Sequence, residues 1–152
     1  MTYSDIEARQ GLLDTLARAT DEIGFVVAYL GAAYEQLDEI TADELEERLF
    51  RPAQLAYGRA KRTHAAFASR HGLVGRPFEV QAAGLPSTGA RGFIDNGAEA
   101  ASSASGMLAT LQDSPLTIEV GDVELRAGLA EVRELTAPLP QHARELIRGL
   151  GR

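Results

Sequence analysis

The chain of 152 residues has the length of one ordinary domain, and its content of 45% hydrophobic and 24% charged residues is typical of a globular protein. No apolar run approaches the roughly 20 residues of a membrane-spanning helix, and residues 1–10 carry acids where a secretory signal has basic residues. The absence of cysteine excludes disulfides, thiolate nucleophiles and thiolate metal sites. We therefore expect one cytoplasmic domain over residues 1–152, and the preference for arginine over lysine suggests a bacterial source.

The first predicted element is a long amphipathic helix from Ser4 to about Leu37. Its apolar residues recur with heptad-like spacing at Leu13, Leu16, Ile23, Val27, Leu30, Tyr34 and Leu37. Gly24 and Gly31 lie beside this stripe, and each costs about 1 kcal/mol of helix propensity relative to alanine. We therefore expect another helix to approach closely at these two glycines.

The second predicted helix begins at a capping-box pattern, in which Thr41 caps a helical amide and Glu44 reaches back to Thr41. Pro52 lacks an amide hydrogen, which predicts either a kink near Leu49 or a break with a new helix starting at Pro52. The apolar face beyond it contains Ala56, Tyr57, Ala60, His64, Phe67 and His71. Gly72 is expected to end the helix.

A long glycine-rich connector over residues 72–97 is expected to join the second and third helices, with a short strand at Phe78–Ala82. The third helix is predicted over Asn96–Leu111. The alternation of Leu116, Ile118 and Val120 predicts a second strand that would pair with the first in a small ribbon.

Asp122 is placed to cap a fourth helix, which Pro138 and Pro140 interrupt before a last helical segment at Gln141–Leu150. Four helical segments with mostly short connections favour an all-α antiparallel four-helix bundle. The sequence thus predicts a single helical-bundle domain with one long connector.

The connector includes Leu85-Pro86-Ser87-Thr88-Gly89, which resembles the LPxTG signal that sortases cleave in Gram-positive surface proteins. Such a signal is followed closely by a membrane-spanning segment and a basic tail. Here 63 residues follow Gly89, and none forms such a span. We therefore interpret the match as coincidental and the segment as a loop.

Charge is segregated along the chain: residues 1–47 hold 12 acidic and 2 basic residues, whereas residues 48–78 hold 7 basic residues and no acidic one. Helical periodicity gathers an arginine stripe on the second helix, formed by Arg48, Arg51, Arg59, Arg62 and Arg70. The stripe could pair with the acidic first helix or simply be solvated. It could also bind phosphate, nucleic acid or an acidic partner, or meet the acidic helix of a second copy across a two-fold axis. A net charge of −7 disfavours nucleic acid as the partner.

Motifs for catalysis or metal binding are absent from the sequence. The acidic residues between Glu35 and Glu47 lack the spacing and central glycine of an EF-hand loop. No histidine follows a glutamate by three residues, as di-iron bundles require, and His64 and His71 lie two turns apart. The GxSxG, Walker A and GxGxxG patterns are also missing. We therefore expect no catalytic residue, metal or cofactor.

Our leading hypothesis is a non-catalytic structural or protein-interaction role, with self-association as a homodimer or an unidentified protein partner and no membrane contact. The expected interface contains Gly24, Gly31, Arg51, Arg59, Arg62 and Arg70. An alternative is a small-molecule-binding or enzymatic bundle whose interior site contains Tyr34, Tyr57, His64 and Arg91. A third hypothesis is an anion or nucleic-acid binder that uses the arginine stripe.

Overall fold

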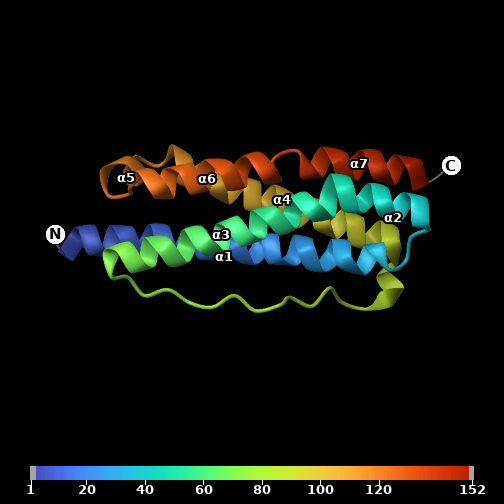
Figure 1. Cartoon of the computed structure of the whole chain (residues 1–152), viewed down its shortest axis with the longest axis horizontal. Helices are drawn as coiled ribbons and strands as arrows, with labels where there is room; N and C mark the ends of the chain where they lie inside the picture. Colours follow the sequence, from blue (N-terminus) through green and yellow to red (C-terminus); the bar gives the residue numbers. More distant parts are fainter. Residues whose placement is uncertain (1–2, 151–152) are drawn as a thin grey trace.

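The computed structural model describes residues 3–150, and the regular secondary structure in that range is helical throughout (Figure 1). The α-helices are α1 (Tyr3–Tyr34), α2 (Glu39–Leu45), α3 (Arg51–His71), α4 (Gly89–Asp113), α5 (Pro115–Glu119), α6 (Val123–Thr136) and α7 (Leu139–Leu150). A π-helical segment, Glu46–Phe50, joins α2 to α3, and a 3-10 turn, Pro86–Thr88, precedes α4. The expected all-α class is confirmed. None of the helices described combines the length and apolar character needed to cross a membrane.

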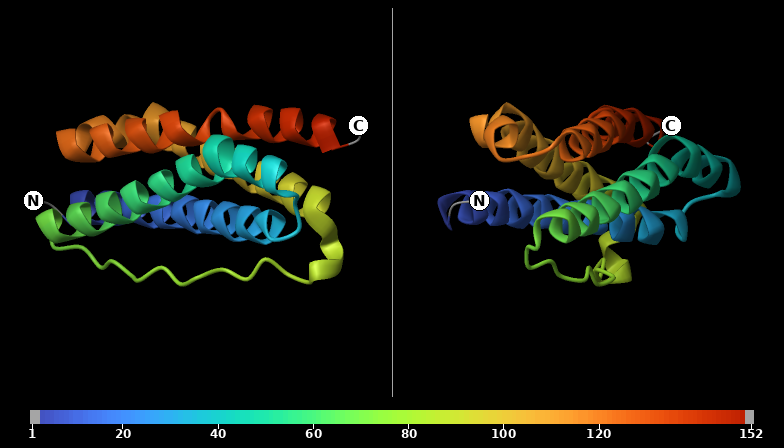
Figure 2. Two further views of the ribbon diagram at one scale, coloured as in Figure 1. Left: turned by 45° about the vertical axis from the view of Figure 1, so that its right-hand side comes forward. Right: turned by 60° about the vertical axis from the view of Figure 1, so that its left-hand side comes forward.

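Helix α1 packs against both α4 and α3, and α6 and α7 complete the packing. At one end α6 contacts α3 and α4, while at the other end α7 contacts α4 and the π-helical segment. Figure 2 shows α6 and α7 following one another along the same side of the molecule. Each end therefore has its own group of helices around an apolar interior.

Two apolar clusters fill these two ends. The cluster at the α6 end includes Leu13, Leu16, Phe67, Leu108 and Leu129. The cluster at the α7 end includes Leu30, Leu49, Phe93, Ile94 and Leu139. All ten side chains are buried, and full burial of such a side chain contributes roughly 1.5–3 kcal/mol to stability.

The N-terminus of α2 differs from the predicted capping box. The cap is Asp38, whose carboxylate accepts the Thr41 amide at 2.9 Å and the Thr41 hydroxyl at 2.9 Å. Because this carboxylate accepts both groups, Thr41 is a residue of the first turn and the helix already begins at Glu39. The cap predicted at Thr41 is therefore wrong.

At Pro52 the helix continues instead of breaking. The preceding segment is π-helical, and the Arg51 amide donates to the Glu46 carbonyl five residues earlier. Pro52 has no amide hydrogen to offer the Arg48 carbonyl, and the Nδ1 atom of His142 lies 3.3 Å from that oxygen. The change of direction here is visible in Figure 2, so of the two predicted alternatives the chain adopts a kink.

Helix α4 begins at Gly89, seven residues earlier than predicted, which shortens the irregular connector to residues 73–85. The sequence predicts the glycines of this stretch to be loop residues. Gly97 is instead buried in the helix, where an added Cβ would lie 3.3 Å from Leu30 Cδ2. Its lack of a side chain allows α4 to pack closely on α1.

The predicted two-stranded ribbon is wrong. Residues 78–82 belong to the extended connector and pair with no strand in the described range, and the other segment lies in α5. In α5 the polar residue Thr117 is buried and its hydroxyl donates to the Leu111 carbonyl at 2.5 Å, while Leu116 and Ile118 are exposed. In this segment, the alternation of apolar residues therefore did not predict which side chains are buried.

Candidate functional site

The four residues of the predicted interior site do not converge. Tyr57 lies against Gly24, where an added Cβ would be 3.3 Å from the tyrosine Cε1. Tyr34 is ten residues further along α1, about 15 Å away at 1.5 Å per residue, and is exposed. Arg91 is exposed in the first turn of α4, whereas only 3% of His64 is exposed. The structure therefore does not support one interior site built from these residues.

His64 lies beneath the connector. The Phe78 ring meets the imidazole edge-on, with 4.9 Å between ring centroids. An added Cβ at Gly75 would lie 3.2 Å from the His64 Cε1 atom, so the connector backbone also approaches the ring closely. Burial, and then the charge of Arg76, lower the pKa of His64, while Asp14 and Asp21 oppose the shift.

The connector, residues 73–85, is held along α1 as a strap. Gln10 both donates to the Val74 carbonyl at 2.9 Å and accepts the Val74 amide at 3.0 Å. Arg76 forms an ion pair with Asp21, with Nη2 2.5 Å from Oδ2. Beyond the strap, Gln36 donates to the Pro86 carbonyl at 2.9 Å. Because these partners advance in order along α1, the strap runs parallel to that helix, as Figure 1 shows.

Three arginines of the stripe are bound to carboxylates within the chain. Arg48 pairs with Glu145 of α7 at 2.6 Å, and Arg59 pairs with Glu131 of α6 at 2.5 Å. Arg70 pairs with Asp122 at 2.8 Å. Pairing with the acidic first helix, one of the alternatives from the sequence, is wrong for these three. Helix α6 packs on α3 and α7 packs on the π-helical segment, so that Glu131, the cap residue Asp122 and Glu145 supply the acids. Binding of a phosphate by the whole stripe loses support for the same reason.

Asp122 joins the end of α3 to the start of α6. Its carboxylate caps α6 by accepting the Leu125 amide at 2.7 Å, as the sequence predicted, and accepts two bonds from Arg70 at 2.8 and 2.9 Å. His71 Nε2 lies 2.8 Å from the same carboxylate. Burial acts to raise the pKa of Asp122, but the bonds from Arg70, Leu125 and His71 together hold it well below the usual range. We call these bonds the clamp, because they hold the C-terminal end of α3 to the N-terminus of α6.

The other two arginines of the stripe are exposed. Arg51 and Arg62 make no hydrogen bond or ion pair with any other residue between positions 3 and 150. Between them on the same side of α3 lies Leu55, which is 57% exposed. The outer side of α3 therefore combines an apolar side chain with two available positive charges.

The outer side of the preceding segment is acidic. Ile40 at the start of α2 is 83% exposed, and the carboxylates of Glu39, Asp43 and Glu47 around it are exposed and form no ion pair with another described residue. Helical periodicity, together with the wider turn of the π-helical segment, places this acidic surface next to the basic outer side of α3. We name as the α2–α3 outer face the residues Ile40, Asp43, Glu47, Arg51, Leu55 and Arg62. The sequence indicated its charges, but not that two large aliphatic side chains are exposed among them.

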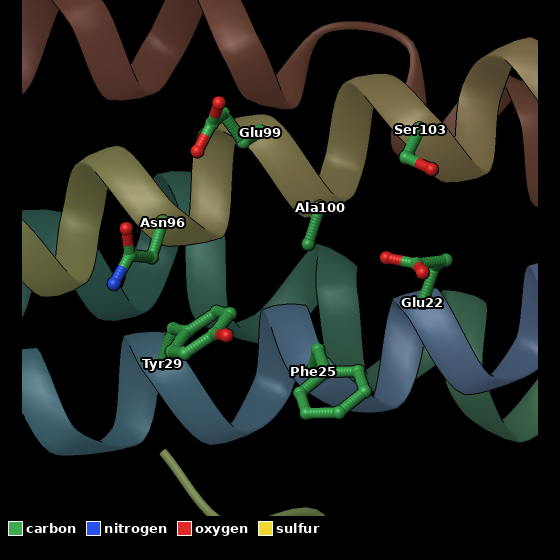
Figure 3. Close-up of a pocket in the computed structure, with 7 residues that line it drawn as sticks. All are labelled: Glu22, Phe25, Tyr29, Asn96, Glu99, Ala100 and Ser103. Carbon is green, nitrogen blue, oxygen red and sulfur yellow. The ribbon is translucent and has the colours of Figure 1, made fainter. Parts of the chain in front are cut away.

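A groove of about 470 Å³ lies between α1 and α4 (Figure 3). It is lined by Glu22, Phe25 and Tyr29 from α1 and by Asn96, Glu99, Ala100 and Ser103 from α4. Asn96 and Tyr29 approach one another from opposite walls in Figure 3. The lining contains carboxylates, an amide and hydroxyls but no histidine, so the groove offers donors and acceptors of hydrogen bonds. The groove was not predicted from the sequence, because it depends on how α4 packs on α1.

Within residues 3–150, no three aspartate, glutamate or histidine side chains are grouped so that they could hold a metal ion. Comparisons of the chain with protein-family models, with curated proteins and with solved structures find no match. The functional argument therefore depends on the geometry of this chain alone.

Proposed function

We propose that this protein is a non-catalytic interaction protein that forms a homodimer through the α2–α3 outer face. The observation that carries the proposal is that Ile40 and Leu55 are both exposed on the kinked α2–α3 segment, Ile40 among acidic residues and Leu55 between two arginines. Such a face is complementary to a second copy of itself. The fold that we propose to carry this face is a single-domain antiparallel four-helix bundle, in which α6 and α7 together form the fourth column.

A two-fold axis near position 49 would set two copies of this face antiparallel. Glu47 of one copy would then lie opposite Arg51 of the other, and the acidic turn around Asp43 would lie opposite Leu55 and its neighbours. Every such contact occurs twice by symmetry. Burial of the aliphatic side chains supplies the apolar part of the binding energy, and the charges fix the orientation.

This interface differs from the one expected from the sequence. Gly24 is buried under Tyr57 and Gln81 and is not available to a second chain. Arg59 and Arg70 are bound to α6 and to its cap. Gly31 lines a hollow beside Tyr34, Glu46 and Phe50 and is not among the residues of the α2–α3 outer face. Of the expected interface residues, Arg51 and Arg62 remain in the proposal.

Reversal of the two central charges tests this arrangement. Glu47→Arg and Arg51→Glu each place like charges opposite one another, so each variant is expected to elute as a monomer in light-scattering chromatography at low salt. The double variant restores the opposite pairing and is expected to recover the dimer. Glu119→Arg is a matched control, because Glu119 is exposed on α5 at the other end of the molecule. Failure of the double variant to dimerise where both single variants dissociate would contradict the antiparallel pairing.

A further inference from the structure

The strap covers a titratable group that has no hydrogen-bond partner. His64 is 3% exposed, and its ring nitrogens form no hydrogen bond with any residue in the described range. Its neighbours on the strap are the Phe78 ring and the backbone at Gly75. The ring nitrogens retain slight access to solvent, since within residues 3–150 the one fully buried side-chain nitrogen without a partner is Arg9 Nη1. The apolar cover still favours the neutral imidazole, because burial is costly for a charged group.

The charges around His64 come from the strap and from α1. Arg76 lies on the strap, with its guanidinium carbon 4.8 Å from the Phe78 ring centroid, and it adds a positive charge near the imidazole. Asp14 and Asp21 of α1 act in the opposite sense, but Asp21 is already paired with Arg76. Protonation of His64 would therefore add a second cation beneath a strap that already contains one.

We propose that the strap is a pH-sensitive lid over the α1–α3 face, closed while His64 is neutral and released when His64 takes up a proton. The closed strap covers His64 and Ala68. Release lets water reach the imidazolium and moves Arg76 away from it. The strap has polar anchors to α1 at Gln10 and Asp21 and an apolar anchor at Phe78, so it can detach without unfolding a helix.

The direction of the pH dependence follows from linkage. The closed state lowers the pKa of His64, so the open state, with an ordinary histidine pKa of about 6.5, binds the proton more tightly. The closed state is therefore favoured above about pH 6.5 and is weakened as the pH falls below that value. Each unit of difference between the two pKa values raises the opening constant by up to about tenfold in acid.

The chain contains no cysteine, so a single thiol can report on opening. Ala68 is buried beneath Gly75, where an added Cβ would lie 3.4 Å from the Ala68 Cβ, while the neighbouring Ser69 is exposed. The labelling rate of Ala68→Cys with dithiodipyridine, divided by that of Ser69→Cys at the same pH, measures the opening constant. Division by the exposed thiol removes the intrinsic pH dependence of the reaction.

The ratio is expected to rise at least severalfold from pH 7.5 to pH 5, while far-UV circular dichroism shows unchanged helix content. His64→Leu should abolish the rise, and His142→Gln, at the α7 end of the molecule, should leave it intact. Phe78→Ala should raise the ratio at every pH, which shows that the assay detects a loosened strap. A ratio that does not change with pH, an equal rise in His64→Leu, or loss of helix content in step with labelling would each overturn the proposal.

Discussion

Substitution of Gly128 by alanine tests the contact between α3 and α6. An added Cβ at Gly128 would overlap the Thr63 hydroxyl and lie 2.6 Å from Thr63 Cγ2 and 3.0 Å from Thr63 Cβ. Thr63 is buried, and its hydroxyl is bonded to the Arg59 carbonyl at 2.8 Å. A rotamer change would leave the Cβ contact in place, so the helices must separate.

Overpacking of this kind typically costs 1–3 kcal/mol, and alanine returns up to about 1 kcal/mol through its helix propensity. We expect Gly128→Ala to lose about 1–2 kcal/mol of unfolding free energy, which corresponds to a Tm lower by roughly 2–8 °C for a domain of this size. Urea unfolding monitored by circular dichroism measures the change. Gly106→Ala is the control, because an added Cβ there meets nothing within 4 Å, and it should be neutral or stabilising.

A second substitution separates the close contact from other effects of alanine. Thr63→Ala removes the hydroxyl and the methyl group, which are the two closest contacts of the new Cβ, and leaves only the 3.0 Å contact with the Cβ of residue 63. The double variant should therefore recover part of the stability that Gly128→Ala loses. The expected coupling energy is about 1–2 kcal/mol. Wild-type stability in Gly128→Ala, or no recovery in the double variant, would refute the close packing of α3 on α6.

Substitutions at two further positions test the bonds of Asp122 and the attachment of the strap. Asp122→Ala should lower the free energy of unfolding by about 2 kcal/mol, because it removes a helix cap and the bonds from Arg70 and His71, whereas Asp122→Asn retains the cap and should lose less. Since folding lowers the pKa of Asp122, its contribution is present at neutral pH and is lost as the pH falls below about 4, so urea unfolding should show variant and wild type converging in acid. Gln10→Ala removes both bonds to Val74, worth about 1 kcal/mol, and should raise the labelling ratio of the buried cysteine about fivefold at pH 7.5. An unchanged ratio would show that this anchor does not hold the strap.

Local sequence patterns predicted α1, the end of α3 and the start of α6. The spacing of apolar residues identified α1, and Gly72 was correctly predicted to follow α3, where it adopts φ +62°. Asp122 was correctly predicted as the cap of α6, because a short acidic side chain before an amphipathic stretch is a strong local signal. These features depend on neighbouring residues, so the sequence was sufficient.

Features that depend on packing were not predicted. The start of α4 was misplaced because Gly97 looks like a loop residue until Leu30 is known to lie against it. The acids that bind Arg48 and Arg59 lie more than 70 residues away in sequence, and only the arrangement of α6 and α7 identifies them. The contact between Phe78 and His64 was also not predicted, because an extended connector has no periodic pattern that indicates which residues it contacts.

The most direct test of the proposed self-association is the molar mass of the unmodified protein by light scattering, at 50 and 500 mM salt and at several concentrations. The monomer has a mass of 16.3 kDa. The α2–α3 outer face predicts twice that mass at low salt, with a concentration-dependent shift towards the monomer at high salt as the opposed charges are screened. A mass equal to that of the monomer at every salt and protein concentration would contradict the proposal.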